Sequence, residues 1–451
     1  MNVIDVKERP TLTRRIVGHD PQKLGEWLLT AYLGTAPVYW LPGLPMGSMQ
    51  LVKFALIAGA CGVVWYNAVR NDHPLFPNGI TGLTGFYLVV LTSFTGVIRA
   101  ASLGAVIDTM VNFTQCFVFL WTLYIFYTRG GNVVRVFRNA AIIIVLFSIP
   151  PLTNWFFGVP GWSYSGENPL WSTGFTNKRS GWSQGLAFYL PILAALPFFS
   201  LRKKAFTNLL SLGGIAILLA SQFITGGRSG LLASMVVLAA LSMLLLPRRV
   251  TVVLLVALVS IGGYFSDFAY EHLRFHRFTE WSYESINEFS SYRLEDYVAA
   301  YDLFWARPLG HGFGQSVQIL MREYQQSTEL HNVWLRLLAD GGVLLLISSL
   351  GVVVGLLSKS IKAMNPRVLN HVRAGMPIRH AARRRQLLLV VCLASVLGGL
   401  SISMFAPRTP IGVFQNSAMW WGSAGAIVGL AATSWRSDTR RRASTHGSDN
   451  K

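Results

Sequence analysis

Long apolar segments alternate with short polar segments along almost the whole chain. About 20 helical residues cross the roughly 30 Å of a bilayer's hydrocarbon, so apolar stretches of this length predict membrane spans. About twelve such stretches occur, at residues 24–41, 49–69, 80–98, 105–127, 139–157, 183–199, 206–224, 230–246, 250–266, 334–357, 387–406 and 411–432. The pattern predicts an all-α polytopic membrane protein with about 12 transmembrane helices.

Composition agrees with this fold class. Hydrophobic residues make up 52% of the 451 residues and charged residues only 13%, whereas a soluble domain carries about 25% charged residues. Cys61, Cys116 and Cys392 all fall in apolar runs without paired spacing, which indicates buried thiols rather than disulfides or a metal site. The polar N-terminal segment 1–23 lacks the features of a cleaved secretory signal, so we expect it to be retained.

Basic residues gather on one side of the predicted topology. If residues 1–23 are cytoplasmic, about 27 of the 39 lysines and arginines fall on the cytoplasmic side, as the positive-inside rule requires. Both termini are then cytoplasmic, including the basic tail 433–451. The net charge of +19 therefore reflects orientation in the membrane, and no nucleic-acid partner is needed to explain it.

One large polar segment, residues 267–333, interrupts the predicted spans. It separates spans 1–9 (24–266) from spans 10–12 (334–432) and lies on the outer side in this topology. Within it, Arg293 to Arg307 carries apolar residues at helical spacing, and Pro308 with several glycines follows. This pattern predicts an amphipathic helix in a partly helical outer loop.

A minority of basic residues stays outside, against the orientation bias. Lys178 and Arg179 precede span 6, Arg228 lies between glycines in the turn before span 8, and Arg293 and Arg307 flank the loop helix. Guanidinium groups bind phosphate oxygens bidentately, and neighbouring glycines admit backbone N–H groups. A lipid-linked diphosphate would explain these positions. Alternatively, the arginines contact lipid headgroups or pair with acids such as Glu295 and Asp296.

His331 lies where the polar loop meets span 10. A histidine there can accept a proton from an attacking hydroxyl while arginines stabilise a departing diphosphate. It can equally be an inert interfacial residue. Glu329 and Asn332 flank it and either contact substrate or serve as ordinary loop and cap residues, and His311 is a competing base within a glycine-rich turn. We expect no metal and no cofactor, because the arginines can replace Mg²⁺ and the outer loops carry no paired-carboxylate motif.

These residues occur in an ordered set that resembles a known family. The set comprises Gly226–Gly230 entering a span, Arg293, Trp305–Gly314, and His331–Leu335 with Gly341–Gly342 following. In order and spacing it is similar to the O-antigen ligase and Wzy-type polysaccharide polymerase superfamily, over about residues 170–350. In addition, Gly174–Gly181 resembles, imperfectly, a stretch of exopolysaccharide polymerases, with Asn177 and Arg179 departing from that pattern.

The resemblance implies a metal-independent, inverting glycosyltransferase of the bacterial inner membrane. Its donor would be an undecaprenyl-diphosphate-linked glycan at the periplasmic face, and its acceptor a glycan or a lipid. Arg228 and Arg293 would match the family's diphosphate-contacting arginines, and His331 its essential loop histidine. Lys178, Arg179, Glu329, Asn332 and Arg307 are further candidates for substrate binding. The imperfect match at Gly174–Gly181 favours a polymerase over a ligase.

Two other kinds of protein remain open from the sequence. A flippase or transporter of lipid-linked sugars would place ionisable residues deep in the spans, whereas the candidates here gather at one face. A non-catalytic assembly protein would use the loop 267–333 to dock a chain-length regulator, and His331 would then be dispensable.

Overall fold

The computed structural model describes residues 21–39, 41, 48–71, 97–158, 175, 179–199, 204–247, 249–252, 280–290, 293–323, 330–374, 376, 378–406 and 414–446. Every secondary-structure element assigned within these ranges is a helix. The helices are α2 (Pro21–Thr35), α3 (Ser48–Arg70), α5 (Leu103–Thr128), α6 (Val133–Phe157), α7 (Arg179–Ala187), α8 (Leu190–Phe199), α9 (Lys204–Ile224), α10 (Arg228–Leu245), α13 (Tyr283–Phe289), α14 (Arg293–Ala306), α15 (Gln315–Glu323), α16 (Val333–Ala363), α17 (Pro366–Arg373), α18 (His380–Ser403) and α19 (Phe414–His446).

Eight helical segments among the described residues are long and apolar enough to cross a membrane. They are Ser48–Arg70, Leu103–Thr128, Val133–Phe157, Ser180–Phe199, Ala205–Ile224, Arg228–Leu245, Val333–Ala363 and His380–Ser403. Each overlaps one predicted span. Of the other four predicted spans, 80–98 and 250–266 lie largely outside the described residues. The span 411–432 overlaps α19. The span 24–41 overlaps α2, whose 15 residues are fewer than a membrane span needs.

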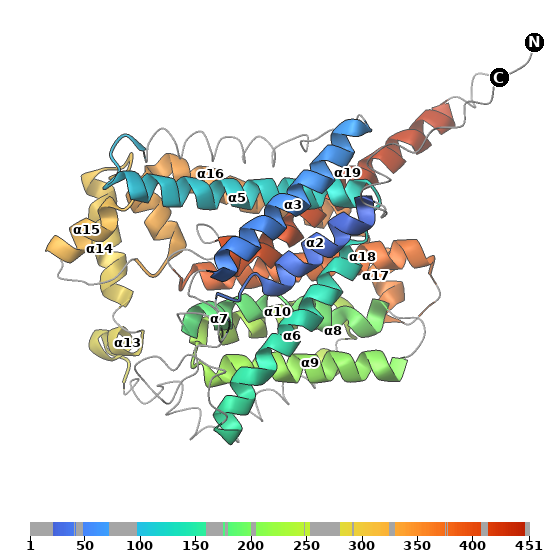
Figure 1. Cartoon of the computed structure of the whole chain (residues 1–451), viewed down its shortest axis with the longest axis horizontal. Coiled ribbons are helices and arrows are strands. Elements are labelled where there is room, and N and C mark those ends of the chain that lie inside the picture. The colour runs from blue at the N-terminus through green and yellow to red at the C-terminus, as the bar shows by residue number, and fades with distance from the viewer. Residues whose placement is uncertain are drawn as a thin grey trace, which may run out of the picture.

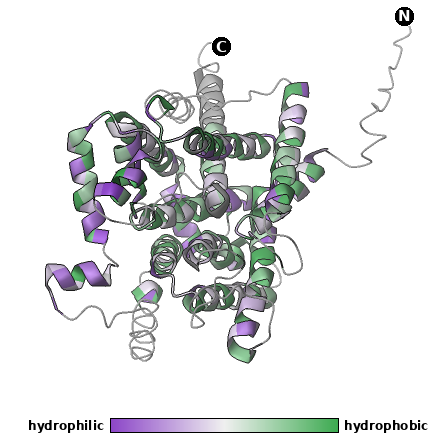
Figure 2. Ribbon diagram, turned by 60° about the vertical axis from the view of Figure 1, so that its left-hand side comes forward, coloured by the Kyte–Doolittle hydropathy of each residue, from purple (hydrophilic) through white to green (hydrophobic). Residues whose placement is uncertain are grey.

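Several of the long helices run alongside one another, α3 and α6 cross them obliquely, and short helices lie beyond both ends (Figure 1). Figure 1 shows α5, α16, α10, α8 and α9 extending in nearly the same direction, with α13, α14 and α15 beyond one end of this bundle and α17 at the other. Figure 2 shows that the long helices are mainly hydrophobic, whereas hydrophilic residues collect in short helices at one side of the molecule. The arrangement is that of a helical membrane protein with polar elements at both ends.

Small residues bring the helices of the core close together. A Cβ atom on Gly425 of α19 would lie 2.3 Å from the carbonyl oxygen of Leu120 in α5, and one on Gly398 of α18 would lie 2.5 Å from the side chain of Val237 in α10. In lipid the hydrophobic effect does not drive helices together, so close backbone approach at such residues supplies much of the packing energy. The pairs α5–α19 and α10–α18 are therefore closely packed helix pairs.

The predicted loop helix is present. It is α14, Arg293–Ala306, which packs against α16 and buries Ala299, Ala300 and Leu303. Its opposite face is exposed, with Tyr301 at 63% and Trp305 at 62%. The apolar spacing thus identified the helix, but the large aromatic residues lie on its outer face and the small ones pack inward.

The helix α16 is broken near its beginning. Gly342 has φ 75° and ψ −174°, so the backbone leaves the helical path there. The turn 308–312 enters the break and pairs the freed backbone groups through three hydrogen bonds: His311 N–H to Ala339 O (2.9 Å), Gly312 N–H to Asp340 O (2.8 Å) and Val343 N–H to Pro308 O (2.9 Å). A non-helical backbone is tolerated at a span end because the protein itself satisfies these groups.

At the opposite end of the bundle, the short helix α17 is tied to the end of α10. Arg373 donates from Nε to the carbonyl of Leu244 (2.9 Å) and from a terminal guanidinium nitrogen to that of Met243 (2.7 Å). These carbonyls belong to the last turn of α10, where helix carbonyls lack intrahelical partners. A cation is favoured there by the helix dipole, so Arg373 caps α10.

We predict that Gly342→Ala destabilises the protein by more than about 2 kcal/mol, because a side chain at positive φ is strained and its Cβ meets backbone. That Cβ would lie 2.3 Å from the carbonyl carbon of Leu309. The matched control is Gly213→Ala in α9, where nothing lies within 4 Å of the added Cβ, so helix propensity favours alanine by up to about 1 kcal/mol. Thermal unfolding of both variants in one detergent checks this, and equal stabilities would contradict the broken-helix geometry.

Candidate functional site

A tight turn between α9 and α10 places Arg228. Helix α9 ends at Ile224, and Arg228 is the first residue of α10. Thr225 stabilises the intervening turn, because its hydroxyl donates to the carbonyl of Gln222 (2.6 Å) and accepts from the N–H of Gly227 (3.2 Å). Arg228 therefore starts from a fixed backbone at a helix N-terminus, where the dipole favours anions.

The glycines of this turn serve close packing. A Cβ on Gly227 would lie 2.6 Å from Cβ of Ser183 in α7, and one on Gly230 would lie 2.5 Å from the carbonyl carbon of Ser183. Ser183 also donates from Oγ to the carbonyl of Gly227 (3.0 Å) and accepts at its own carbonyl from Gln222 (2.8 Å). The sequence had suggested that these glycines admit phosphate to the backbone; in the structure they admit helix α7.

A second helix N-terminus places Arg293. It is the first residue of α14, and its N–H donates to the hydroxyl of Ser290 (3.1 Å). Arg228 and Arg293 are far apart in the sequence, yet both line one cavity of about 440 Å³. The first turns of α10 and α14 contribute Ser229 and Leu294 to the same lining. Two cations and two helix N-termini therefore face one space.

Apart from these arginines, the cavity is mainly apolar. Its remaining walls include Leu231, Leu232, Met235, Tyr297 and Phe405. Burial lowers the pKa of the Arg293 guanidinium from its ordinary value, and the neighbouring Tyr297 and Asp296 partly offset this effect. The cation therefore lies where the protein solvates it poorly, which is the environment in which an anionic ligand gains most from pairing with it.

Asp296 holds His331 at the start of α16. The ring Nδ1 of His331 lies 2.9 Å from Oδ2 of Asp296, and its backbone N–H donates to the same oxygen (3.1 Å). Asp296 is only 3% exposed, whereas the side chain of His331 is 31% exposed. Because a carboxylate accepts, Nδ1 carries the proton and Nε2 keeps a lone pair. The residue can act as a base on a group that approaches from outside.

His331 is not among the residues that line the arginine cavity. It is connected to that cavity through α14, since Asp296 follows Arg293 by three residues and so lies on the same side of the helix. Sequence reasoning missed this role of Asp296, which it considered only as a partner for arginines. The available signal in the sequence was that Asp296 follows Arg293 by three residues, which puts both side chains on one side of a helix.

The other candidates have different surroundings. Asn332 is the N-cap of α16 and accepts from the N–H groups of Trp334 (2.9 Å) and Leu335 (3.3 Å), so its side-chain oxygen serves the helix. Arg307 is exposed and lines a separate cavity. Arg179 begins α7, but its side chain lies outside the described residues, as do Lys178 and Glu329.

His311, the competing base, is a buried residue of the turn. It is 6% exposed, its Nε2 lies 2.7 Å from the carbonyl oxygen of Leu303, and its N–H donates to Ala339. Both interactions tie the turn 308–312 to the helices on either side. His311 therefore has a structural position, and His331 is the more accessible histidine.

The fold and these residues define a polytopic helical membrane protein with a mainly apolar cavity that two arginines line. Residues 213–350 match the family model Wzy_C, described as O-antigen ligase. The match confirms the resemblance to the O-antigen ligase and Wzy-type superfamily for this part of the chain, which holds Arg228, Arg293, Asp296 and His331. It begins after Gly174–Gly181, the stretch that resembles exopolysaccharide polymerases. No curated protein matches the chain.

We predict that Arg293→Met leaves thermal stability unchanged or raises it, because burial disfavours the charged guanidinium in the folded state. The matched control is Arg336→Met, since Arg336 pairs with the buried Asp340 (3.5 Å) and its loss leaves that carboxylate without this partner. We expect the control to unfold at a lower temperature. A melting temperature for Arg293→Met as low as that of the control would show that Arg293 holds the fold rather than a ligand.

Proposed function

We propose that the chain is an inverting, metal-independent glycosyltransferase that uses an undecaprenyl-diphosphate-linked glycan at the periplasmic face of a bacterial inner membrane. The observation that carries the proposal is the shared cavity of Arg228 and Arg293. Its apolar walls suit a polyprenyl chain and its two guanidinium groups suit a diphosphate. The helix N-termini at which both arginines begin add to the positive potential.

The proposed reaction transfers a sugar from the diphosphate to a hydroxyl group. The acceptor oxygen bonds to the anomeric carbon as the bond from that carbon to the diphosphate oxygen breaks, which inverts the anomeric centre. The electron pair of the broken bond leaves with the diphosphate, whose added negative charge Arg228 and Arg293 stabilise. The hydroxyl proton passes to Nε2 of His331.

Asp296 supports this role of His331 in two ways. Its carboxylate accepts from Nδ1, which fixes the tautomer with a free lone pair on Nε2, and its negative charge stabilises the imidazolium that forms. Because Asp296 and Arg293 share helix α14, one rigid element carries a leaving-group cation and the residue that orients the base. Positions built on a helix are held more accurately than positions on a loop.

Within this class we propose a polymerase that joins glycan repeat units. The resemblance of Gly174–Gly181 to exopolysaccharide polymerases supports it. A ligase that attaches glycan to lipid A core is the second candidate, which the description of the matching family as O-antigen ligase favours. The two differ in what accumulates when the activity is lost: single repeat units on the carrier lipid for a polymerase, and long unattached chains for a ligase.

We predict that His331→Ala lowers the transfer rate about 10²- to 10⁴-fold, and that Arg228→Ala lowers it about 10²- to 10³-fold. Asp296→Asn should act as His331→Ala does, through the wrong tautomer. The measurement is the rate at which purified protein elongates or attaches glycan from the natural lipid-linked donor. The species that accumulates in cells carrying each variant then distinguishes polymerase from ligase.

Matched controls for these variants are His371→Ala and Arg367→Ala, two exposed residues of α17 at the other end of the bundle. Both should transfer at the wild-type rate. Undiminished transfer by His331→Ala and Arg228→Ala would refute the proposal. Movement of unchanged lipid-linked glycan across sealed vesicles would instead indicate a flippase, and a requirement for the loop 267–333 but not for His331 would indicate an assembly protein that docks a chain-length regulator.

We also propose that α13–α15 are periplasmic and α17 cytoplasmic, with both termini inside. The basic segment 358–386 supports this orientation through the positive-inside rule. In a background without Cys61, Cys116 and Cys392, we predict that Arg307→Cys reacts with a membrane-impermeant maleimide in spheroplasts. Arg367→Cys should react only after permeabilisation, although both positions are exposed. The reverse labelling would invert the topology and remove the site from the periplasm.

A further inference from the structure

We infer that the second cavity, between α14 and α15, binds the saccharide chain of a substrate at a distance from the reacting bond. The inference rests on the proposed function and adds to it a site for glycan that is separate from the arginine cavity. Its lining comes from the C-terminal half of α14 with Arg307, from His311 of the turn 308–312, and from one side of α15.

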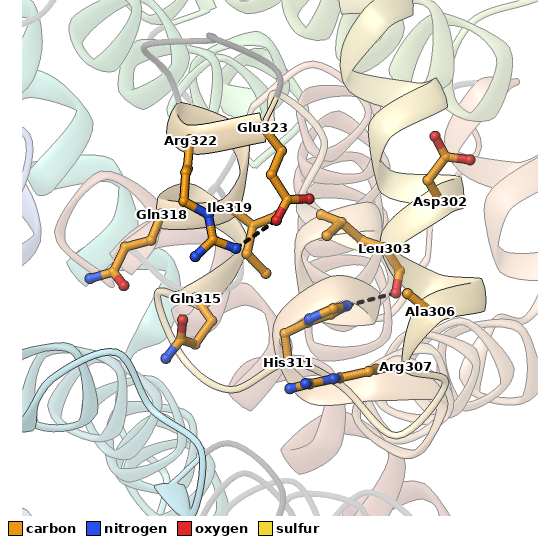
Figure 3. Close-up of a pocket in the computed structure, with 10 residues that line it drawn as sticks. All are labelled: Asp302, Leu303, Ala306, Arg307, His311, Gln315, Gln318, Ile319, Arg322 and Glu323. Atoms are coloured by element: carbon orange, nitrogen blue, oxygen red, sulfur yellow. Dashed lines mark hydrogen bonds and ion pairs between the residues drawn. The ribbon is translucent and has the colours of Figure 1, made fainter.

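The lining of this cavity has the chemistry that sugar hydroxyls require. Its volume is about 570 Å³, within the range of ligand pockets. Figure 3 shows the polar side chains around it, which are Asp302, Arg307, Gln315, Gln318, Arg322 and Glu323. Carboxylates only accept, guanidinium groups only donate, and amides do both. A saccharide presents hydroxyls that donate and accept in alternation, so this mixture can satisfy several of them at once.

The two cavities differ in polarity as the two parts of a lipid-linked glycan differ. The arginine cavity has mainly aliphatic and aromatic walls, with Leu231, Leu232 and Phe405 among them. In the second cavity the main apolar side chains are Leu303, Ala306 and Ile319, and the polar groups outnumber them. Binding of a polyprenyl chain in the second cavity would cost free energy, because the polar side chains there would give up water without gaining hydrogen-bond partners.

Hydrogen bonds hold the backbone around the second cavity in place. His311 lies on its lining and belongs to the turn inserted into the break of α16. Helix α15 is fixed by Asp340, whose Oδ1 accepts from the N–H of Ser316 (3.2 Å) in the first turn of α15. Figure 3 shows the ring of His311 pointing to the carbonyl of Leu303, between the two helices. These contacts hold the backbone of the site, whereas a ligand would still have to order the exposed side chains of Gln318, Arg322 and Glu323.

The spacing along α14 connects the two cavities to one substrate. Arg293 lines the first cavity, Asp296 holds His331, and Asp302 lines the second. Leu303 also lines the second cavity, and it follows Asp296 by seven residues, so it lies on the same side of α14 about 10 Å further along the helix. A short saccharide that presents its reacting group near His331 therefore reaches the second cavity with its next units.

The test is a binding measurement on the purified full-length protein in nanodiscs. The probe is the lipid-free repeat-unit oligosaccharide that mild acid releases from the lipid-linked glycan of the producing cell, followed by calorimetry. We expect the double variant Gln318→Ala, Arg322→Ala to bind it about 10- to 100-fold more weakly, as the loss of two hydrogen-bonding groups implies. Met321→Ala is the matched control, because Met321 lies on the same helix and is exposed but does not line the cavity.

The variant Arg228→Ala separates this inference from the proposed function. We expect it to bind the oligosaccharide as the wild type does and yet to lose transfer, whereas the double variant should need more acceptor or donor glycan for the same rate. Equal binding by wild type and double variant, or no saturable binding by the wild type, would refute the glycan site alone. Transfer that survives both Arg228→Ala and His331→Ala would refute the proposed function, whatever affinity is measured for the oligosaccharide.

A competition arm identifies which substrate supplies the saccharide. Intact lipid-linked donor should displace the lipid-free probe if the donor's own glycan occupies the second cavity. It should leave the probe bound if the acceptor occupies it. Both results require that the cavity binds saccharide, and they assign the cavity to the donor or to the acceptor.

Discussion

The insertion of the turn 308–312 into the broken helix α16 is the interaction on which the polar end of the molecule depends. A helix that is interrupted at a span end exposes carbonyl and N–H groups that neither lipid nor the helix can pair. Here the turn pairs them, and it can do so only because Gly342 adopts a positive φ and Gly310 admits backbone at its Cβ position. Helices α14 and α15 flank this turn in sequence, so their positions follow from it.

The two arginines of the first cavity place stability and function in opposition. Burial disfavours the charge on Arg293, and the lining around it is mainly apolar. A fold selected for stability alone would fill such a place with a hydrophobic residue. Retaining two cations there is understandable if an anion enters the cavity and pairs with them. Local departures from good packing are commonly found at sites of function.

Much of the fold could be predicted from hydrophobic periodicity, because the length of an apolar run indicates a span and helical spacing indicates a loop helix, although that spacing did not identify which face of α14 is buried. The eight spans and the helix from Arg293 were found in this way. The shared side of Arg228 and Arg293 in the predicted topology was compatible with their facing one space, but it did not predict that His331 lies outside the lining of that cavity. The break at Gly342 and the bond between Asp296 and His331 were not predicted, because both arise from contacts between segments that are distant in sequence. A polar residue's type shows what it can bind, whereas its partner is fixed only by the tertiary structure.

The capping of α10 by Arg373 gives a second role to a basic loop that is cytoplasmic in the proposed topology. Lysines and arginines of such loops are usually explained by their effect on insertion, which ends once the chain is in the bilayer. Arg373, however, continues to hold the last carbonyls of the same helix that begins with Arg228. A helix of 18 residues is a stiff rod about 27 Å long, so sliding or tilting at its last turn is transmitted to its first turn. The position of Arg228 is thereby anchored from the opposite end of the helix.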